Sequence, residues 1–80
     1  MEWWQMKAFR ALGQIEGLCN FEFNIEQETW VGDMGDAIVN GDPEDVKALT
    51  HEGVGKFEDD CVKESIVELW WLVNFYATMR

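Results

Sequence analysis

Few side chains in this sequence have the types and spacing that chemistry requires. His51 is the single histidine, and together with Cys19 or Cys61 it could form a nucleophile and base. No motif that would orient such a pair accompanies these residues. His51 also falls at the predicted end of a helix, where a protonated histidine interacts favourably with the helix dipole. We therefore expect a non-enzymatic protein in which His51 has a local structural role.

Metal and nucleotide motifs are also incomplete. Asn40, Asp42 and Glu44 alternate like the first ligands of an EF-hand loop, but Asp45 stands where that loop requires glycine. The segment 53–55 is too short for a phosphate-binding loop, and no Lys-Ser/Thr follows it. We expect no metal and no cofactor.

The two cysteines lie far apart and form no Cys-x-x-Cys motif. Because both lie beside apolar positions, free buried thiols in a reducing compartment are the simplest interpretation, and a disulfide between Cys19 and Cys61 stays open. No cleavable signal is recognisable, because Glu2 precedes any apolar run. The apolar C-terminal run is shorter than the roughly 20 residues of a membrane span. These features predict a cytoplasmic protein.

Charge is the strongest bulk property of the chain. Sixteen acidic residues against six basic ones give a net charge of −10, and no Lys or Arg occurs between Ala11 and Val46. Such a chain is repelled by nucleic acid and by anionic membranes, so we expect its partner to be a basic protein surface. The alternative is that the acids only keep a small, aromatic-rich protein soluble.

Helical periodicity dominates the 80 residues, which suffice for one domain. Five Trp, five Phe and one Tyr supply a core for so short a chain. Asn40, Gly41, Asp42 and Pro43 mark a helix end followed by a helix start, and Gly53 is predicted to end the helix that follows. We predict a mainly α, compact four-helix domain with helices at about 2–18, 25–40, 43–52 and 55–79.

The segment 20–31 is ambiguous. Phe21, Phe23 and Ile25 alternate with polar residues, which predicts a strand paired with 28–31 in a short β-hairpin and hence an α+β fold. Against the hairpin, Asn24 and Gln27 resemble an N-cap and its capping-box partner. That signal favours a helix whose inward residues are Trp30, Met34, Ala37 and Ile38.

The C-terminal helix is apolar over most of its circumference. Leu72 and Phe75 widen an inward stripe, whereas Trp71 falls on the opposite side with Asp60 and Glu64. Trp is enriched at interface hot spots, so either the chain covers this helix on two sides or Trp71 meets a partner or a second copy. The inward stripe consists of Val62, Ile66, Leu69, Val73 and Tyr76.

Carboxylates three or four residues apart on a helix lie about 5–6 Å apart, which is near the spacing of successive backbone phosphates. A folded display of such groups can imitate nucleic acid and occupy a basic channel. The alternative is an ordinary solvated helix face. The predicted partner-binding residues are Asp33, Asp36, Asp42, Glu44, Asp45, Glu58, Asp59, Asp60 and Glu64, with Trp71 as an apolar anchor.

The base-free acidic stretch Glu16–Asp45, the acidic cluster Glu58–Asp60 and the single small domain resemble the small phage-encoded inhibitors of bacterial defence, namely the anti-CRISPR proteins and the acidic DNA-mimic anti-restriction proteins. The resemblance implies a stoichiometric inhibitor that acts in the host cytoplasm. Such an inhibitor binds a CRISPR effector complex or a nuclease and blocks its DNA-binding surface. The alternative is a small homodimeric structural or adaptor domain that assembles through the C-terminal helix.

Overall fold

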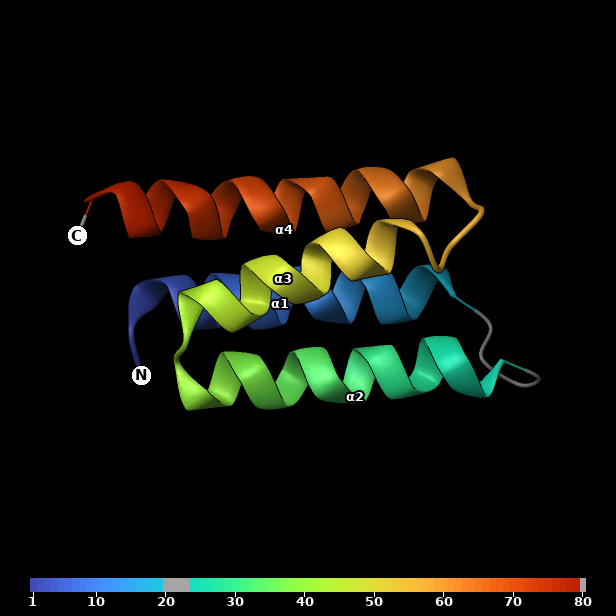
Figure 1. Cartoon of the computed structure of the whole chain (residues 1–80), viewed down its shortest axis with the longest axis horizontal. Helices are drawn as coiled ribbons and strands as arrows, with labels where there is room; N and C mark the ends of the chain where they lie inside the picture. The colour runs from blue at the N-terminus through green and yellow to red at the C-terminus, as the bar shows by residue number, and fades with distance from the viewer. Residues whose placement is uncertain (20–23, 80) are drawn as a thin grey trace.

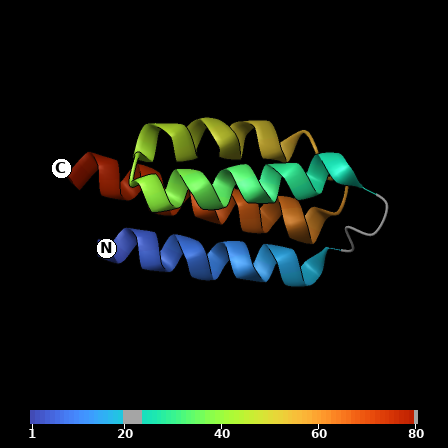
Figure 2. The ribbon, with the colours of Figure 1, turned by 90° about the horizontal axis from the view of Figure 1, so that it is seen from below.

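The computed structural model describes residues 1–19 and 24–79, which form four helices: α1 (Trp3–Leu18), α2 (Ile25–Asn40), α3 (Pro43–Val54) and α4 (Asp60–Met79). Each helix runs antiparallel to the next, so both termini lie at the same end of the bundle (Figure 1). Consecutive helices pack together and α4 packs on α1, which closes the bundle (Figure 2). The predicted mainly α, four-helix architecture is confirmed.

The hairpin alternative is wrong for residues 25–31, which are helical. Residues 25–31 begin α2, while residues 20–23, with Phe21 and Phe23, lie outside the described part. The side chain of Asn24 accepts a hydrogen bond from the Gln27 backbone N–H at 3.0 Å, which satisfies a free donor of the first helical turn. The Gln27 amide donates to the Lys56 carbonyl at 2.9 Å and so ties this helix start to the α3–α4 connection.

The boundary between α3 and α4 also differs from the prediction. Gly53 does not end α3, which continues to Val54, and α4 begins at Asp60 rather than near Gly55. Gly53 stands inside the helix because Trp30 packs directly against it. A Cβ atom at position 53 would lie 2.4 Å from Cζ2 of Trp30, closer than carbon atoms approach. This glycine therefore permits close packing of α2 on α3.

The residues between α3 and α4 are held by a buried ring and a helix cap. Phe57 is buried against Trp30, with ring centroids 5.4 Å apart and planes at 75°. The Asp59 carboxylate accepts hydrogen bonds from the backbone N–H groups of Cys61 (2.8 Å) and Val62 (3.3 Å). Burial of Phe57 and capping by Asp59 account for the five-residue delay in the start of α4.

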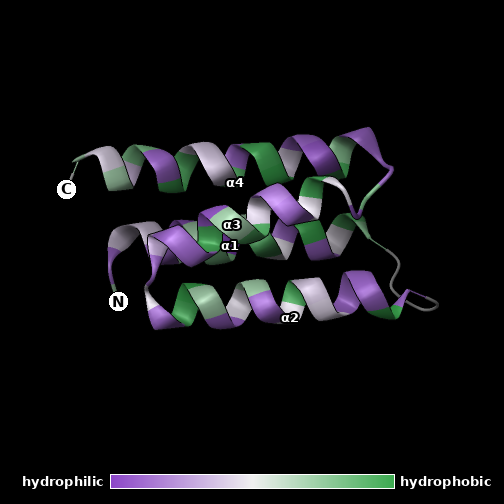
Figure 3. Cartoon of the chain, in the orientation of Figure 1, coloured by the Kyte–Doolittle hydropathy of each residue, from purple (hydrophilic) through white to green (hydrophobic). Residues whose placement is uncertain are grey.

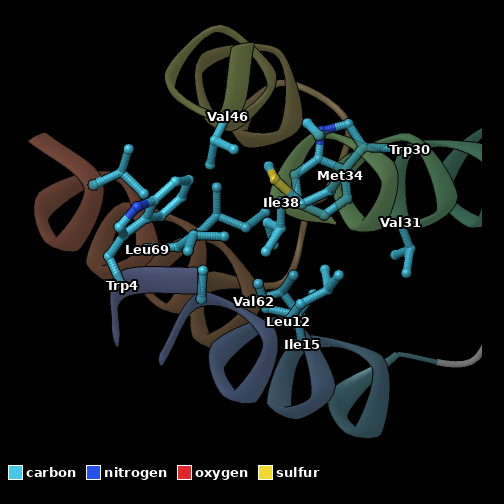
Figure 4. Packing of buried hydrophobic residues seen from close by; sticks show 14 of the residues in the cluster. Trp4, Leu12, Ile15, Trp30, Val31, Met34, Ile38, Val46, Val62 and Leu69 are labelled. Carbon is cyan, nitrogen blue, oxygen red and sulfur yellow. The ribbon is translucent and has the colours of Figure 1, made fainter. Parts of the chain in front are cut away.

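The core is built from one stripe of each helix (Figure 4). Trp4 and Leu69 lie at one side of it, and Trp30 with Met34 at the other. The predicted inward stripe of α4 is buried in full, but Phe75 is exposed and Leu72 only half-buried. The predicted inward residues Ala37 and Ile38 are buried, and so are Ala8, Leu12 and Ile15 of α1 and Val46 of α3.

A buried amide joins the start of α1 to the end of α2. Gln5 Nε2 donates to the Ile38 carbonyl at 2.8 Å, and its Oε1 accepts from the Glu2 backbone N–H at 2.7 Å. Gly41 adopts φ = 71°, and its N–H donates to the same Ile38 carbonyl at 3.0 Å. The left-handed C-cap and the Asp42–Pro43 helix start that the sequence predicts are both confirmed.

Two glycine substitutions are expected to act in opposite directions. Gly53→Ala forces Trp30 to move and should lower the free energy of unfolding by about 1–3 kcal/mol. At Gly32, on the exposed side of α2, a Cβ meets no atom within 4 Å, so Gly32→Ala should raise it by about 0.5–1 kcal/mol. Urea unfolding followed by circular dichroism measures both changes. Equal effects of the two substitutions would contradict the close packing of Trp30 on Gly53.

Candidate functional site

The fold brings acidic side chains of α2 and α3 together. Asp33 and Asp36 from α2 and Asp45 and Glu52 from α3 line one open groove of about 300 Å³, hereafter the α2–α3 acidic groove. All four residues are exposed. The rest of its described lining is Ala37, Asn40, Ala48 and Leu49, and Lys56 lies beside Glu52 at one end. Figure 3 shows hydrophilic residues along both helices.

Local sequence places each of these carboxylates. Trp30 and Met34 face the core, which turns the intervening Asp33 outward, and Asp36 lies one turn further on. The indole N–H of Trp30 donates to the Leu49 carbonyl at 2.8 Å and fixes the spacing between α2 and α3. The groove therefore depends on the packing of a buried tryptophan.

Glu52 is a groove residue that the sequence analysis missed. It lies seven residues after Asp45 and therefore on the same side of α3. The seven-residue spacing can be read from the sequence. It indicates a shared groove only when the side of α3 that packs on α2 is known. At that end of the groove Lys56 Nζ lies 2.8 Å from Glu26 Oε1 and 3.5 Å from Glu52 Oε1. Its hydrogen bond to Glu26 lowers the pKa of that carboxyl and raises the pKa of Lys56.

Two predicted binding residues have a structural role in the helices. The Asp42 carboxylate accepts hydrogen bonds from the backbone N–H groups of Glu44 (3.0 Å) and Asp45 (3.4 Å), which caps α3. Asp59 caps α4 in the same way. Their charges remain exposed, but their replacement would remove a cap worth about 0.5–2 kcal/mol.

The predicted acids form two separate groups. Asp42 and Glu44 lie at the α2–α3 turn, beside the end of the α2–α3 acidic groove. The other group, Glu58, Asp59, Asp60 and Glu64, lies around the start of α4 at the opposite end of the bundle (Figure 1). The bundle thus presents one groove and one remote cluster rather than a continuous acidic surface.

Trp71 projects from the outer side of α4 with 60% of its surface exposed. Its ring meets Trp70 edge-on, with centroids 5.0 Å apart. Both indoles line an apolar groove of about 430 Å³ between α3 and α4, together with Thr50, His51, Val54 and Val67. The described residues therefore leave Trp71 uncovered. This exposure is what we expect if Trp71 meets a partner or a second copy.

The groups that suggested chemistry are dispersed. His51 lies exposed in the last turn of α3, Cys19 follows α1 and Cys61 lies in the first turn of α4. Both cysteines are free thiols, but the prediction that they are buried is wrong, because Cys61 is exposed and Cys19 is only half-buried. Within residues 1–19 and 24–79, no cluster of three or more His, Cys, Asp or Glu side chains is placed to hold a metal ion. None of the helices there combines the length and apolar character that crossing a membrane demands.

Comparison with protein-family models, curated proteins and solved structures finds no match for this chain.

The two thiols should differ in reactivity. Burial and the neighbouring Asp59 carboxylate raise the pKa of Cys19, which lowers its thiolate fraction near pH 8. Cys61 is exposed and should react faster with a disulfide reagent such as DTNB. Rates measured on Cys19→Ser and Cys61→Ser variants, native and in denaturant, test this expectation. A Cys19 that reacts as fast as Cys61 in the native protein would contradict it.

Proposed function

We propose that this protein is a non-enzymatic, stoichiometric inhibitor that binds the basic, nucleic-acid-binding surface of a host protein or complex through the α2–α3 acidic groove. A CRISPR effector complex is the kind of target that the resemblance to anti-CRISPR and DNA-mimic proteins implies. The observation that carries the proposal is the convergence of Asp33, Asp36, Asp45 and Glu52 from two helices on one groove. Within the described residues, the ion pair formed by these four carboxylates is the one between Glu52 and Lys56 at the end of the groove.

The distribution of charge around α3 supports this choice of surface. Asp45 and Glu52 line the groove with α2, whereas His51 lines the apolar groove with α4. Carboxylates held on two helices need no rearrangement of the backbone on binding, which reduces the entropic cost of association. Their field would also accelerate the encounter with a positively charged channel.

The proposed mechanism is competition for the nucleic-acid site. Carboxylates at roughly phosphate spacing take the place of the backbone phosphates against Lys and Arg of the target. One inhibitor chain then blocks one DNA-binding channel without any covalent step. The contact is largely electrostatic, so its affinity should fall steeply as salt concentration rises.

Reversal of two groove charges tests the surface. Asp33→Lys/Asp36→Lys leaves the caps Asp42 and Asp59 intact and should weaken binding by about 100-fold at low salt, because like charges then face each other. The matched control is Glu16→Lys/Glu28→Lys, which changes the net charge equally at exposed positions outside the groove.

The measurement begins with capture of a target by the tagged chain from a bacterial lysate that carries active defence systems, with washes at low and then high salt. The captured complex is then titrated with the chain while its bound fluorescent DNA is followed by anisotropy. Release of DNA at one chain per complex, lost only with the groove variant, is the expected result. Equal activity of the groove and control variants, or a captured partner that keeps its DNA, would overturn the proposal.

A further inference from the structure

We propose that a second copy of this chain packs on the outer side of α4, antiparallel and with Trp71 at the two-fold axis. This surface is distinct from the α2–α3 acidic groove. It consists of Val67, Trp71 and Phe75, which are 40%, 60% and 59% exposed and follow one another at four-residue spacing. We call these three residues the α4 outer stripe.

The stripe lies opposite the buried side of α4. Residues four apart on a helix are neighbours on one side, so the three side chains form a continuous ridge. Met79, which is also exposed, lies beyond its C-terminal end, and Trp70 borders it toward α3. Contiguous exposed apolar surface of this kind marks an interaction site, whereas single exposed apolar residues are ordinary.

The order of residues along α4 suits a two-fold partner. With Trp71 on the axis, an antiparallel copy sets Val67 of one chain against Phe75 of the other, since each lies four residues from the centre. The contact is therefore self-complementary, which is the requirement for a closed dimer. Trp71 meets its own copy at the centre of the interface, where hot-spot residues concentrate.

Charge along α4 selects the antiparallel orientation. Asp60, Glu64 and Glu68 lie in the N-terminal half together with Lys63, and Leu69–Met79 carries no charged residue. In the antiparallel arrangement Glu64 faces Thr78 and Glu68 faces Asn74 of the second copy. A parallel copy would set each carboxylate against itself, which is destabilising.

The area is adequate for a modest dimer. Large aromatic side chains bring roughly 150–250 Å² each, so the exposed parts of Trp71 and Phe75 supply about 200–300 Å² per chain. With Val67, Met79 and the flanking polar residues, two copies bury on the order of 1,000 Å², the lower limit of a specific interface. We therefore expect a dimer that forms at micromolar concentration.

Salt should strengthen this dimer. Each chain carries a net charge of −10, so association brings together two mutually repelling bodies through an apolar contact. Binding through the acidic groove has the opposite salt dependence. The two surfaces can thus be tested separately, and failure of one leaves the other intact.

Sedimentation equilibrium of the full chain at 0.05 and 0.5 M NaCl tests the dimer. We expect a dimer at tens of micromolar whose dissociation constant falls as salt rises. Trp71→Glu should weaken it by at least about 100-fold, because two carboxylates then meet on the axis. Met6→Glu, at an exposed apolar position of α1, is the matched control and should leave it unchanged. A strictly monomeric wild type, or equal effects of the two variants, would overturn the proposal.

Disulfide trapping tests the orientation. In a Cys19→Ser/Cys61→Ser background, Val67→Cys chains are mixed with Phe75→Cys chains and oxidised with a glutathione buffer. The antiparallel pair predicts an excess of the mixed disulfide over both homodisulfides, which mass spectrometry counts. Homodisulfides in excess would show a parallel pair, and a random distribution would overturn the specific contact.

Discussion

The packing of Trp30 on Gly53 is the contact on which the arrangement of α2, α3 and the start of α4 depends. The indole lies where the side chain of residue 53 would stand, and its N–H donates to the Leu49 carbonyl at 2.8 Å. This one contact sets the distance and rotation between α2 and α3. It also holds Phe57 under the connection to α4. The acidic groove and the start of the last helix therefore depend on the same buried ring.

The sequence predicted the helix boundaries correctly where the residues that set them act locally. Asn24 and Gly41 act on backbone groups within a few residues, so their effects could be read without knowledge of the fold. Gly53 could not be read in this way, because a glycine serves equally to end a helix or to admit a neighbour, and only the position of Trp30 decides between them. The prediction that Phe75 faces inward was wrong. Residue spacing gives the direction of a side chain around the helix axis, but it does not show how much of the helix surface the neighbouring helices cover.

The candidate site was predictable only in part. Asp33, Asp36 and Asp45 were expected to act as a surface, and the fold does bring them together. Glu52 joined them because α3 meets α2 on that side, which is a tertiary fact. Conversely, Glu58–Asp60 was predicted to belong to the same binding surface, but this segment lies at the end of the bundle opposite the α2–α3 turn. The net charge of a sequence predicts the sign of the charge on its partner. The arrangement of the helices determines which acidic residues one partner can contact at the same time.

The closure of α4 on α1 bears on how the chain is made. Tyr76 donates a hydrogen bond to Glu2, 74 residues earlier, and its ring stacks on Trp4 with centroids 5.2 Å apart. The first helix can pack on α2 early, but its contact with the end of α4 forms only after residue 76 has left the ribosome. Until then the part of α1 that α4 covers, with Trp4, is open to chaperones and to other nascent chains. The bundle is thus completed by its last helix, and substitutions at the buried Tyr76 should lower the expression yield.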